Sequence, residues 1–469
     1  MTISNYLTIA EALHGYRTKK FSPVELVSAH ADRAHELHGK LNAFQHLDCE
    51  SAIARARAAE QEFSAGHTPR KLSGIPLSVK SCIDVAGWNC PAGSLLRKDY
   101  IPTTDAVLVQ RLEAAGAILL GSTNTPEFLM AYETNNRVMG KTCNPWNLEY
   151  SAGGSSGGES AAISSGCTMG GVGSDGGGSV RTPAHFCGIC GLKPTPGRIP
   201  ATGHYPPGVG AFSWIGVVGP MARTVADLRI LFEVMAGPDA GDALSSPVPV
   251  RAIAANELAG LRVGVLESAA LKAATPETNA AVQRAANILQ QNKFRVENFR
   301  MEKLDRALEL WWYFFGPVIS GEIRKTSEGK ESLLSPMLQG YLEVAAHEPA
   351  PTYNSFLTAC ADRDGLRADI LRQMKDVPLL ISPVSTGPAF KHGEGNYRSG
   401  DAHNYRDTMR HCQWLNLAGF PGLSLPMGKS PEGLPINVQF IARPYQEELL
   451  LAVAEVVERE RGPWQAPPI

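Results

Sequence analysis

The sequence predicts an α/β protein built on one wide sheet, because short buried strands alternate with amphipathic helices. The strands are brief apolar runs such as residues 74–80 and 117–120, and helical patterns separate them. Such alternation is typical of sheets with helices on both faces. With 469 residues the chain exceeds one ordinary core, although a large α/β enzyme can hold a single wide sheet. Length alone therefore leaves the number of domains open.

The N-terminal part is predicted to be helical. Residues 8–45 look like two helices, because Ser22 and Glu25 form a capping box with Pro23 at the first helical position. A further helix is expected over the alanine-rich residues 51–63.

Later elements follow the same periodicities. The expected helices are residues 104–115, 275–291 and 447–459, and the expected strands are residues 74–80, 117–120, 261–266, 379–383 and 438–441. Residues 301–375 look helical throughout, so they are expected to form an insertion on the sheet. Their aromatic run 311–315 fits ordinary helix packing, which we favour, or the lining of an apolar cleft.

Composition excludes several classes of protein. The chain has 44 basic and 46 acidic residues, a formal charge of -2 and no basic block, so nucleic-acid binding is not expected. No window approaches the roughly 20 apolar residues of a membrane span, and the N-terminus lacks a leader pattern, so we expect a cytoplasmic protein. Nine cysteines indicate reduced thiols. Cys187 and Cys190 form a lone CxxC pair, which is better explained by buried small residues than by zinc.

Residues 153–181 are crowded with glycine and serine. Glycine costs backbone entropy where it is ordered, so a compact enzyme places such a stretch where backbone must approach something closely. A flexible linker is the alternative. Because residues 159–164 are compatible with a helix and apolar sequence follows at once, we interpret the segment as the floor of an active site.

Three short motifs are candidate functional signals. Residues 171–176 match GxGxxG, but the sequence after them cannot open the helix of a dinucleotide-binding fold. Residues 327–330 match SxxK without its companion motifs. Residues 153–157 match GxSxG, so an esterase using Ser155 and a histidine is the strongest rival interpretation. The histidines available to it are His204, His392, His403 and His411.

Taken together, the motifs resemble those of the amidase signature family. Lys80 closes the strand 74–80, the block 153–158 reads GGSSGG, and residues 173–181 read GSDGGGSVR. The separations, 75 residues from Lys80 to Ser155 and 24 from Ser155 to Ser179, are similar to those of the fatty acid amide hydrolase branch. Flanking pieces agree over nearly the whole chain except residues 301–375. They are residues 123–128, 144–146, 191–195, 219–224, 416–421, 433–435 and Gln439.

The resemblance implies the amidase signature fold, in which a large mixed, mostly parallel, twisted sheet is sandwiched between helices. It implies one domain over residues 1–469, with N-terminal helices in residues 1–63. The core would comprise residues 64–300 and 376–469. The resemblance does not reach residues 301–375, whose helical pattern makes them an insertion and a candidate cover of the substrate cleft.

By the same resemblance Ser179 is the nucleophile, Ser155 a bridging serine preceded by a cis peptide bond, and Lys80 the base. The chemistry is independently sensible, because lysine can accept a proton only if burial lowers its pKa. In this hypothesis Ser155 takes the proton of Ser179 and passes its own to neutral Lys80.

The resemblance also implies an oxyanion hole made by the backbone N–H groups of Gly176, Gly177, Gly178 and Ser179. Family members usually carry threonine or isoleucine where this chain has Gly176, which would loosen the loop or widen the site. Asp175 and Arg181 are expected to hold the loop. Ser156 and Ser174 are expected to satisfy backbone groups.

The implied reaction is amide hydrolysis through an acyl-Ser179 intermediate, with no metal and no organic cofactor. Leu129, Met130 and Trp214 suggest an apolar lining, so aryl or alkyl amides are the expected substrates, with carbamates (urethanes) and esters as further candidates. The partner expected is thus a small-molecule amide or carbamate, and a homodimer is left open.

Two further alternatives stay open. One is a glutamine amidotransferase subunit, although residues 212–216 read FSWIG instead of that branch's serine-leucine-aspartate. The other is a non-catalytic subunit that keeps the fold.

Overall fold

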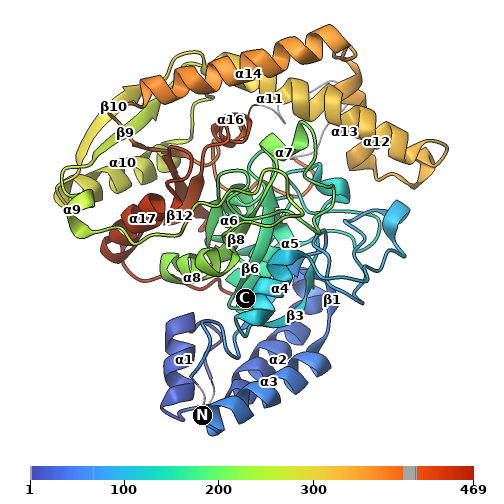
Figure 1. Ribbon diagram of the computed structural model, residues 1–469, viewed down its shortest axis with the longest axis vertical. Helices are drawn as coiled ribbons and strands as arrows, with labels where there is room; N and C mark the ends of the chain where they lie inside the picture. Colours follow the sequence, from blue (N-terminus) through green and yellow to red (C-terminus); the bar gives the residue numbers. More distant parts are fainter. Residues whose placement is uncertain (1–2, 67, 395–406, 408) are drawn as a thin grey trace.

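The computed structural model describes residues 3–66, 68–394, 407 and 409–469, and in it helices surround one eleven-stranded sheet (Figure 1). In sheet order the strands are β1 (Phe44–Leu47), β3 (Ile118–Thr123), β2 (Pro76–Lys80), β6 (Gly170–Asp175), β8 (Val217–Ala222), β7 (Cys190–Lys193), β12 (Gly422–Lys429), β13 (Pro435–Ala442), β11 (Leu379–Pro383), β9 (Arg262–Glu267) and β10 (Arg295–Arg300). A separate hairpin pairs β4 (Cys143–Asn144) with β5 (Asn147–Ser151).

The large mixed sheet between helices is confirmed, but its parallel share is smaller than predicted. Four neighbouring pairs are parallel, namely β2 with β3 and β6, and β9 with β10 and β11. The other six are antiparallel. Strands β12 and β13 form a hairpin, and β8 runs against both β6 and β7, so "mostly parallel" is corrected to a mixed sheet in which antiparallel pairs are the majority.

The helices are assigned as follows. They are α1 (Ile9–Arg17), α2 (Pro23–Leu41), α3 (Cys49–Ser64), α4 (Val107–Ala114), α5 (Gly157–Ser164), α6 (Arg181–Cys187), α7 (Phe212–Ile215), α8 (Val225–Met235), α9 (Ala255–Leu258), α10 (Pro276–Gln291), α11 (Leu304–Tyr313), α12 (Ile319–Ser327), α13 (Pro336–Ala346), α14 (Tyr353–Gln373), α16 (Arg410–Ala418) and α17 (Glu447–Arg461). Short 3-10 turns lie at Leu95–Arg97, Glu127–Leu129 and Glu331–Leu333, and a π-helical turn at Phe314–Val318.

Both faces of the sheet are buried, because alternate residues of a strand point to opposite faces. Leu119 of β3 packs in a core shared with α1, α4, α8, α10 and α17. Its neighbours Ile118 and Leu120 pack instead against α2, α3 and α5. In the C-terminal half the second face packs against α11, α13, α14 and α16. The site described below lies on this second face.

Most expected elements are present. The capping box of Ser22 and Glu25 opens α2, α10 begins at Pro276, and β11 occupies Leu379–Pro383 as predicted. The edge strand β1 is a correction, because the sequence places residues 44 and 45 in a helix. It is four residues long, and three of them are only half-buried, so its alternation is too short to detect. The residues of the rejected GxGxxG motif lie mainly within β6 itself.

The stretch 301–375 is helical in the structure, as expected. Helices α11 to α14 lie side by side at the upper end of the molecule in Figure 1, opposite α1 to α3. Among the described residues, no helix is long and apolar enough to cross a membrane. Cys187 and Cys190 are fully buried, as expected for small core residues.

Candidate active site

A small cavity lies where β2 and β6 end, beside the insertion. These two strands are parallel neighbours, so their carboxyl ends deliver Lys80 and Asp175 to the same edge of the sheet. The lining comprises Leu129, Met130, Ser155, Ser174, Asp175, Gly176, Ser179, His204, Phe212, Gly216, Val217 and Phe315. The cavity therefore brings together two of the predicted catalytic residues, Ser155 and Ser179.

Lys80 is the last residue of β2 and is completely buried. Its Nζ lies 2.6 Å from Ser155 Oγ and donates to Ser174 Oγ at 3.1 Å. Ser155 follows a cis Gly154–Ser155 peptide bond, as expected. The predicted contact between residues 80 and 155 is therefore present. The expectation that Ser174 satisfies a backbone group is wrong, because its hydroxyl faces Lys80 Nζ and Cys82 Sγ. Nothing in the sequence shows which way the side chains of β6 point.

The electrostatics of Lys80 suit a proton acceptor. Burial lowers the pKa of its ammonium group to about 8, although Cys82, Asp175 and Glu159 favour the charged form. Desolvation penalises a charge, and it outweighs these attractions here. Lys80 therefore loses its proton at lower pH than an exposed lysine does.

Ser179 lies on the turn between β6 and α6 and is 7% exposed. The N–H of Ser156 donates to the Ser179 carbonyl at 3.2 Å, which ties this turn to the start of α5. In the part of the chain that the structure describes, no side chain forms a hydrogen bond with Ser179 Oγ. The hydrogen bond between Ser155 and Ser179 that the relay predicts is therefore not formed in this structure, although both residues line the cavity.

The backbone N–H groups near Ser179 differ in whether they have a hydrogen-bond acceptor. The Gly178 N–H donates to Asp175 Oδ1 at 2.7 Å. By contrast, those of Gly176, Gly177 and Ser179 have no acceptor among the described residues. Of the four N–H groups expected to form an oxyanion hole, that of Gly178 is therefore not available, because it is bonded to the Asp175 carboxylate.

Asp175 and Arg181 form a fully buried ion pair that holds the turn. Two Arg181 nitrogens donate to the carboxylate at 3.0 Å each, and Asn416 and Gln439 accept from the same guanidinium. Burial alone would raise the pKa of Asp175, but the Arg181 guanidinium holds it well below its usual range. Ser156 Oγ bonds the backbone of Ser174, 3.3 Å from both its N and its O, so its predicted backbone role is confirmed.

Trp311 of helix α11 and Tyr132 bind backbone carbonyls of the turn that carries Ser179. Trp311 Nε1 donates to the Gly176 carbonyl at 2.9 Å, and the Tyr132 hydroxyl donates to that of Gly177 at 2.8 Å. A Cβ at Gly177 would lie 2.5 Å from Trp311. A Cβ at Gly176 would instead meet only Phe315 and Phe212, at 3.7 and 3.9 Å. Glycine at position 176 therefore leaves space between two aromatic rings of the cavity.

The apolar wall agrees in part with the expectation. Leu129 and Met130 line the cavity, but Trp214 does not. The Trp214 ring packs instead against Phe314 and the Arg363 guanidinium. Phe212, on the same short helix, takes the place expected for Trp214, and Phe315 joins it from the insertion. Thus the aromatic run contributes both helix packing, by Trp311, and cleft lining, by Phe315.

No described histidine contacts Ser155 Oγ. His204 lines the cavity, but its ring nitrogens face the Pro206 carbonyl at 2.9 Å and Cys82 Sγ at 3.5 Å. His392 bonds Glu133, and His411 faces the Lys272 carbonyl. His403 lies outside the described residues. The group beside Ser155 is therefore Lys80, which weighs against the esterase interpretation.

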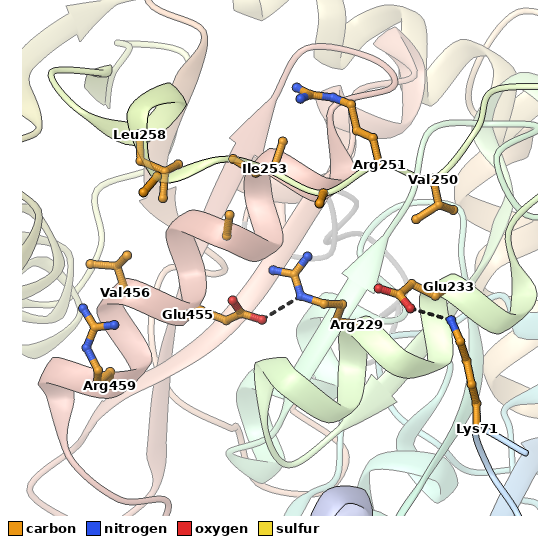
Figure 2. Close-up of a pocket in the computed structure, with 13 residues that line it drawn as sticks. Lys71, Arg229, Glu233, Val250, Arg251, Ile253, Leu258, Glu455, Val456 and Arg459 are labelled. Atoms are coloured by element: carbon orange, nitrogen blue, oxygen red, sulfur yellow. Dashed lines mark hydrogen bonds and ion pairs between the residues drawn. The ribbon is translucent and has the colours of Figure 1, made fainter. Parts of the chain in front are cut away.

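A larger surface groove lies between α8, α9 and α17, away from these residues (Figure 2). Its cations are paired, with Lys71 bonded to Glu233 and Arg229 to Glu455. It contains no serine, cysteine or histidine among its lining residues. The cavity at Ser179 is consequently the better candidate for chemistry.

The fold and the cavity beside Lys80 and Ser155 indicate a class of hydrolase. Comparison with known proteins gives the name of the family. A model of the Amidase family matches residues 25–451. The chain belongs to the amidase family and is a hydrolase of carbon–nitrogen bonds. It is similar to a glutamyl-tRNA(Gln) amidotransferase subunit of Roseiflexus sp. (strain RS-1), with 33% identity over 98% of this chain and 97% of that protein. The corresponding subunit of Moorella thermoacetica is 32% identical over 97% and 96%.

Solved structures with similar folds include several amidases. A protein from a vestigial complex linked to the origins of an s-triazine catabolic enzyme matches with a TM-score of 0.88 and 30% identity, covering 98% of this chain and all of that one (100%). The 6-aminohexanoate cyclic dimer hydrolase matches with 0.85 and 28%, covering 99% of each chain. Fatty acid amide hydrolase matches with 0.86 and 26%, covering 98% of this chain and 86% of that one.

Proposed function

We propose that the protein hydrolyses amides through a covalent acyl-Ser179 intermediate, with Ser155 and Lys80 as a proton relay. Ser179 Oγ attacks the carbonyl carbon. Its proton passes to Ser155 Oγ, which gives its own to neutral Lys80. When the C–N bond breaks, the relay runs backward and protonates the leaving nitrogen. Water then attacks the acyl ester, releases the carboxylic acid and restores Ser179.

The observation that carries this proposal is the buried Lys80 amine 2.6 Å from Ser155 Oγ, at the wall that also holds Ser179. A serine hydroxyl needs a base, and a lysine with its pKa lowered to about 8 can act as one. Catalytic hydrogen bonds are often long before substrate binds. We therefore expect the contact between Ser155 and Ser179 to close in the substrate complex.

The three free N–H groups of Gly176, Gly177 and Ser179 supply the oxyanion hole in this proposal. Preorganised donors aimed at a developing oxyanion are worth about 3 to 4 kcal/mol each in acyl transfer. Asp175 and Arg181 keep the turn in place, and the Trp311 and Tyr132 bonds fix its carbonyls. The relay and the donors together account for amide cleavage without a cofactor.

The cavity favours uncharged aryl or alkyl amides. Leu129, Met130, Phe212, Val217 and Phe315 make its wall apolar. Asp175 is the one charged side chain among the described lining residues, and Gly178, Arg181 and Asn416 already occupy its oxygens. A glutamine substrate would bury an ammonium and a carboxylate without partners, which is costly. Aryl carbamates present the same carbonyl and fit the same wall.

An amidotransferase subunit is the second candidate, because the relatives described above carry that name. Assaying the purified chain with 4-nitroacetanilide, a short alkyl amide, an aryl carbamate and glutamine separates the two. We expect kcat/KM for the anilide to exceed that for glutamine at least about 100-fold, the discrimination that roughly 3 kcal/mol of unpaired buried charge provides.

The control for the panel is Ser179→Ala, which exposes any contaminating amidase. Glutamine as the preferred substrate would contradict the substrate proposal and favour the amidotransferase.

A further inference from the structure

Helix α5 carries a fully buried carboxylate that the relay does not use. Glu159 is the third residue of the helix, which begins two residues after Ser155. It is 0% exposed, in a helix whose other residues are small or apolar. Burying a carboxylate is costly unless it has hydrogen-bond partners. The partners of Glu159 therefore show which elements it holds together.

Glu159 forms hydrogen bonds with β2, the strand that ends at Lys80, and with its neighbour β3. Ser78 Oγ donates to its Oε1 at 2.5 Å, and Thr123 Oγ1 donates to its Oε2 at 2.7 Å. Ser78 lies two residues before Lys80 on β2, and Thr123 of β3 is the residue paired with Lys80 across the ladder. One carboxylate thus joins the start of α5 to both strands at the position of the catalytic amine.

Two glycines make room for this junction. A Cβ at Gly171 of β6 would lie 1.8 Å from Glu159 Oε1, and a Cβ at Gly158 would lie 2.5 Å from the backbone of Asn124. Any side chain at either position would push α5 away from the strands. The close approach of α5 to β2, β3 and β6 is therefore built around this carboxylate.

The charges around the pair are few. Burial raises the pKa of Glu159 to about 7, while Ser78, Thr123 and the Lys80 charge favour its ionised form. The ionisable groups near Lys80 are Cys82, Asp175 and Glu159 itself, which favour its charged form, and the cavity histidine His204. The Glu159 carboxylate and the Lys80 ammonium thus each favour the charged form of the other.

We propose that Glu159 is a positioning residue that sets the separation between Lys80 Nζ and Ser155 Oγ and stabilises the ammonium that forms when the relay accepts a proton. It touches neither substrate nor the reacting atoms. It acts by fastening the helix that follows Ser155 to the strand that ends at Lys80. This inference rests on the relay proposed above.

The test is Glu159→Gln, which keeps the size of the side chain and removes its charge. We expect kcat to fall about 10- to 100-fold, the effect of displacing a catalytic group slightly, while KM stays within about twofold because the cavity wall is unchanged. The acid limb of the kcat/KM profile should move to lower pH, because losing a nearby negative charge lowers the pKa of Lys80.

Ser160→Ala is the matched control. Ser160 is the next residue of α5, is fully buried, and its hydroxyl has no partner among the described residues. Its loss should change neither the rate nor the pH profile. Ser78→Ala keeps the charge but removes one bond, so kcat should fall without a comparable shift of the acid limb. This variant also serves if Glu159→Gln does not fold.

A wild-type pH profile in folded Glu159→Gln, or undiminished kcat in Ser78→Ala, would overturn the positioning role. Ser179→Ala, assayed in parallel, distinguishes the two proposals. If that variant is inactive while Glu159→Gln behaves as wild type, only the positioning role fails. If it is fully active, the serine mechanism fails, and the inference about Glu159 fails with it.

Discussion

Replacing Ser179 with alanine should lower kcat for amide hydrolysis on the order of 10⁶-fold, the loss that follows removal of a serine nucleophile. Without Oγ at this position the proposed acyl ester cannot form. Steady-state hydrolysis of 4-nitroacetanilide measures the effect.

The fold should survive this change. Ser179 Oγ has no hydrogen bond with a described side chain, so its loss leaves no buried group without a partner. The thermal unfolding midpoint should stay within a few degrees, on the order of the shift from 1 kcal/mol. A folded variant that retains more than about one-hundredth of the wild-type kcat would show that another residue is the nucleophile.

Replacing Lys80 with arginine should lower kcat about 10²- to 10⁴-fold, the usual contribution of a general base. Arginine keeps the positive charge and most of the length but cannot give up its proton in a protein. Lys80→Met, which removes the amine and keeps an unbranched side chain, should lose as much. Comparing the two variants separates a requirement for a neutral amine at position 80 from a requirement for a positive charge there.

The pH dependence of the wild-type rate tests the same claim, that Lys80 is the base, because the direction of the change is predicted. The base is active when neutral, so kcat/KM should rise as pH increases through about 8, where the Lys80 pKa is placed by its burial. Substantial activity in Lys80→Arg, or a rate that falls over this pH range, would contradict Lys80 as the base.

The residues that we propose as catalytic could be selected from the sequence because each lies in a short local motif. Lys80 ends an apolar strand, and Ser155 and Ser179 lie among glycines whose spacing from Lys80 matches a known family. These features depend on motifs a few residues long. Lys80 and the turn that carries Ser179 lie at the same edge of the sheet because β2 and β6 are parallel neighbours.

The details that failed depend on side-chain direction and on long-range contacts. Sequence did not show that Asp175 takes the Gly178 N–H, because that bond depends on the shape of the turn. It selected Trp214 for the cavity wall where the structure has Phe212, because the direction of each side chain on the short α7 cannot be read from composition. The junction made by Glu159 with β2 and β3 could not be predicted either, because Ser78 and Thr123 are distant from Glu159 in sequence.

Similarity along the chain and local motif spacing point to different branches of the family. The spacing resembles that of fatty acid amide hydrolase, whereas curated relatives of 32–33% identity are amidotransferase subunits. The apolar cavity without an unpaired charge is why we place the substrate with the amidases. The cytoplasmic location, the single-domain division and a homodimer stay predictions.

The most direct measurement of the central claim is the position of a covalent adduct. The wild-type protein and Lys80→Met would be treated with a serine-directed fluorophosphonate, digested and analysed by peptide mass spectrometry. We expect the wild-type adduct on Ser179 and little or none in Lys80→Met. An adduct on Ser155, or equal labelling without the lysine, would contradict the proposed relay.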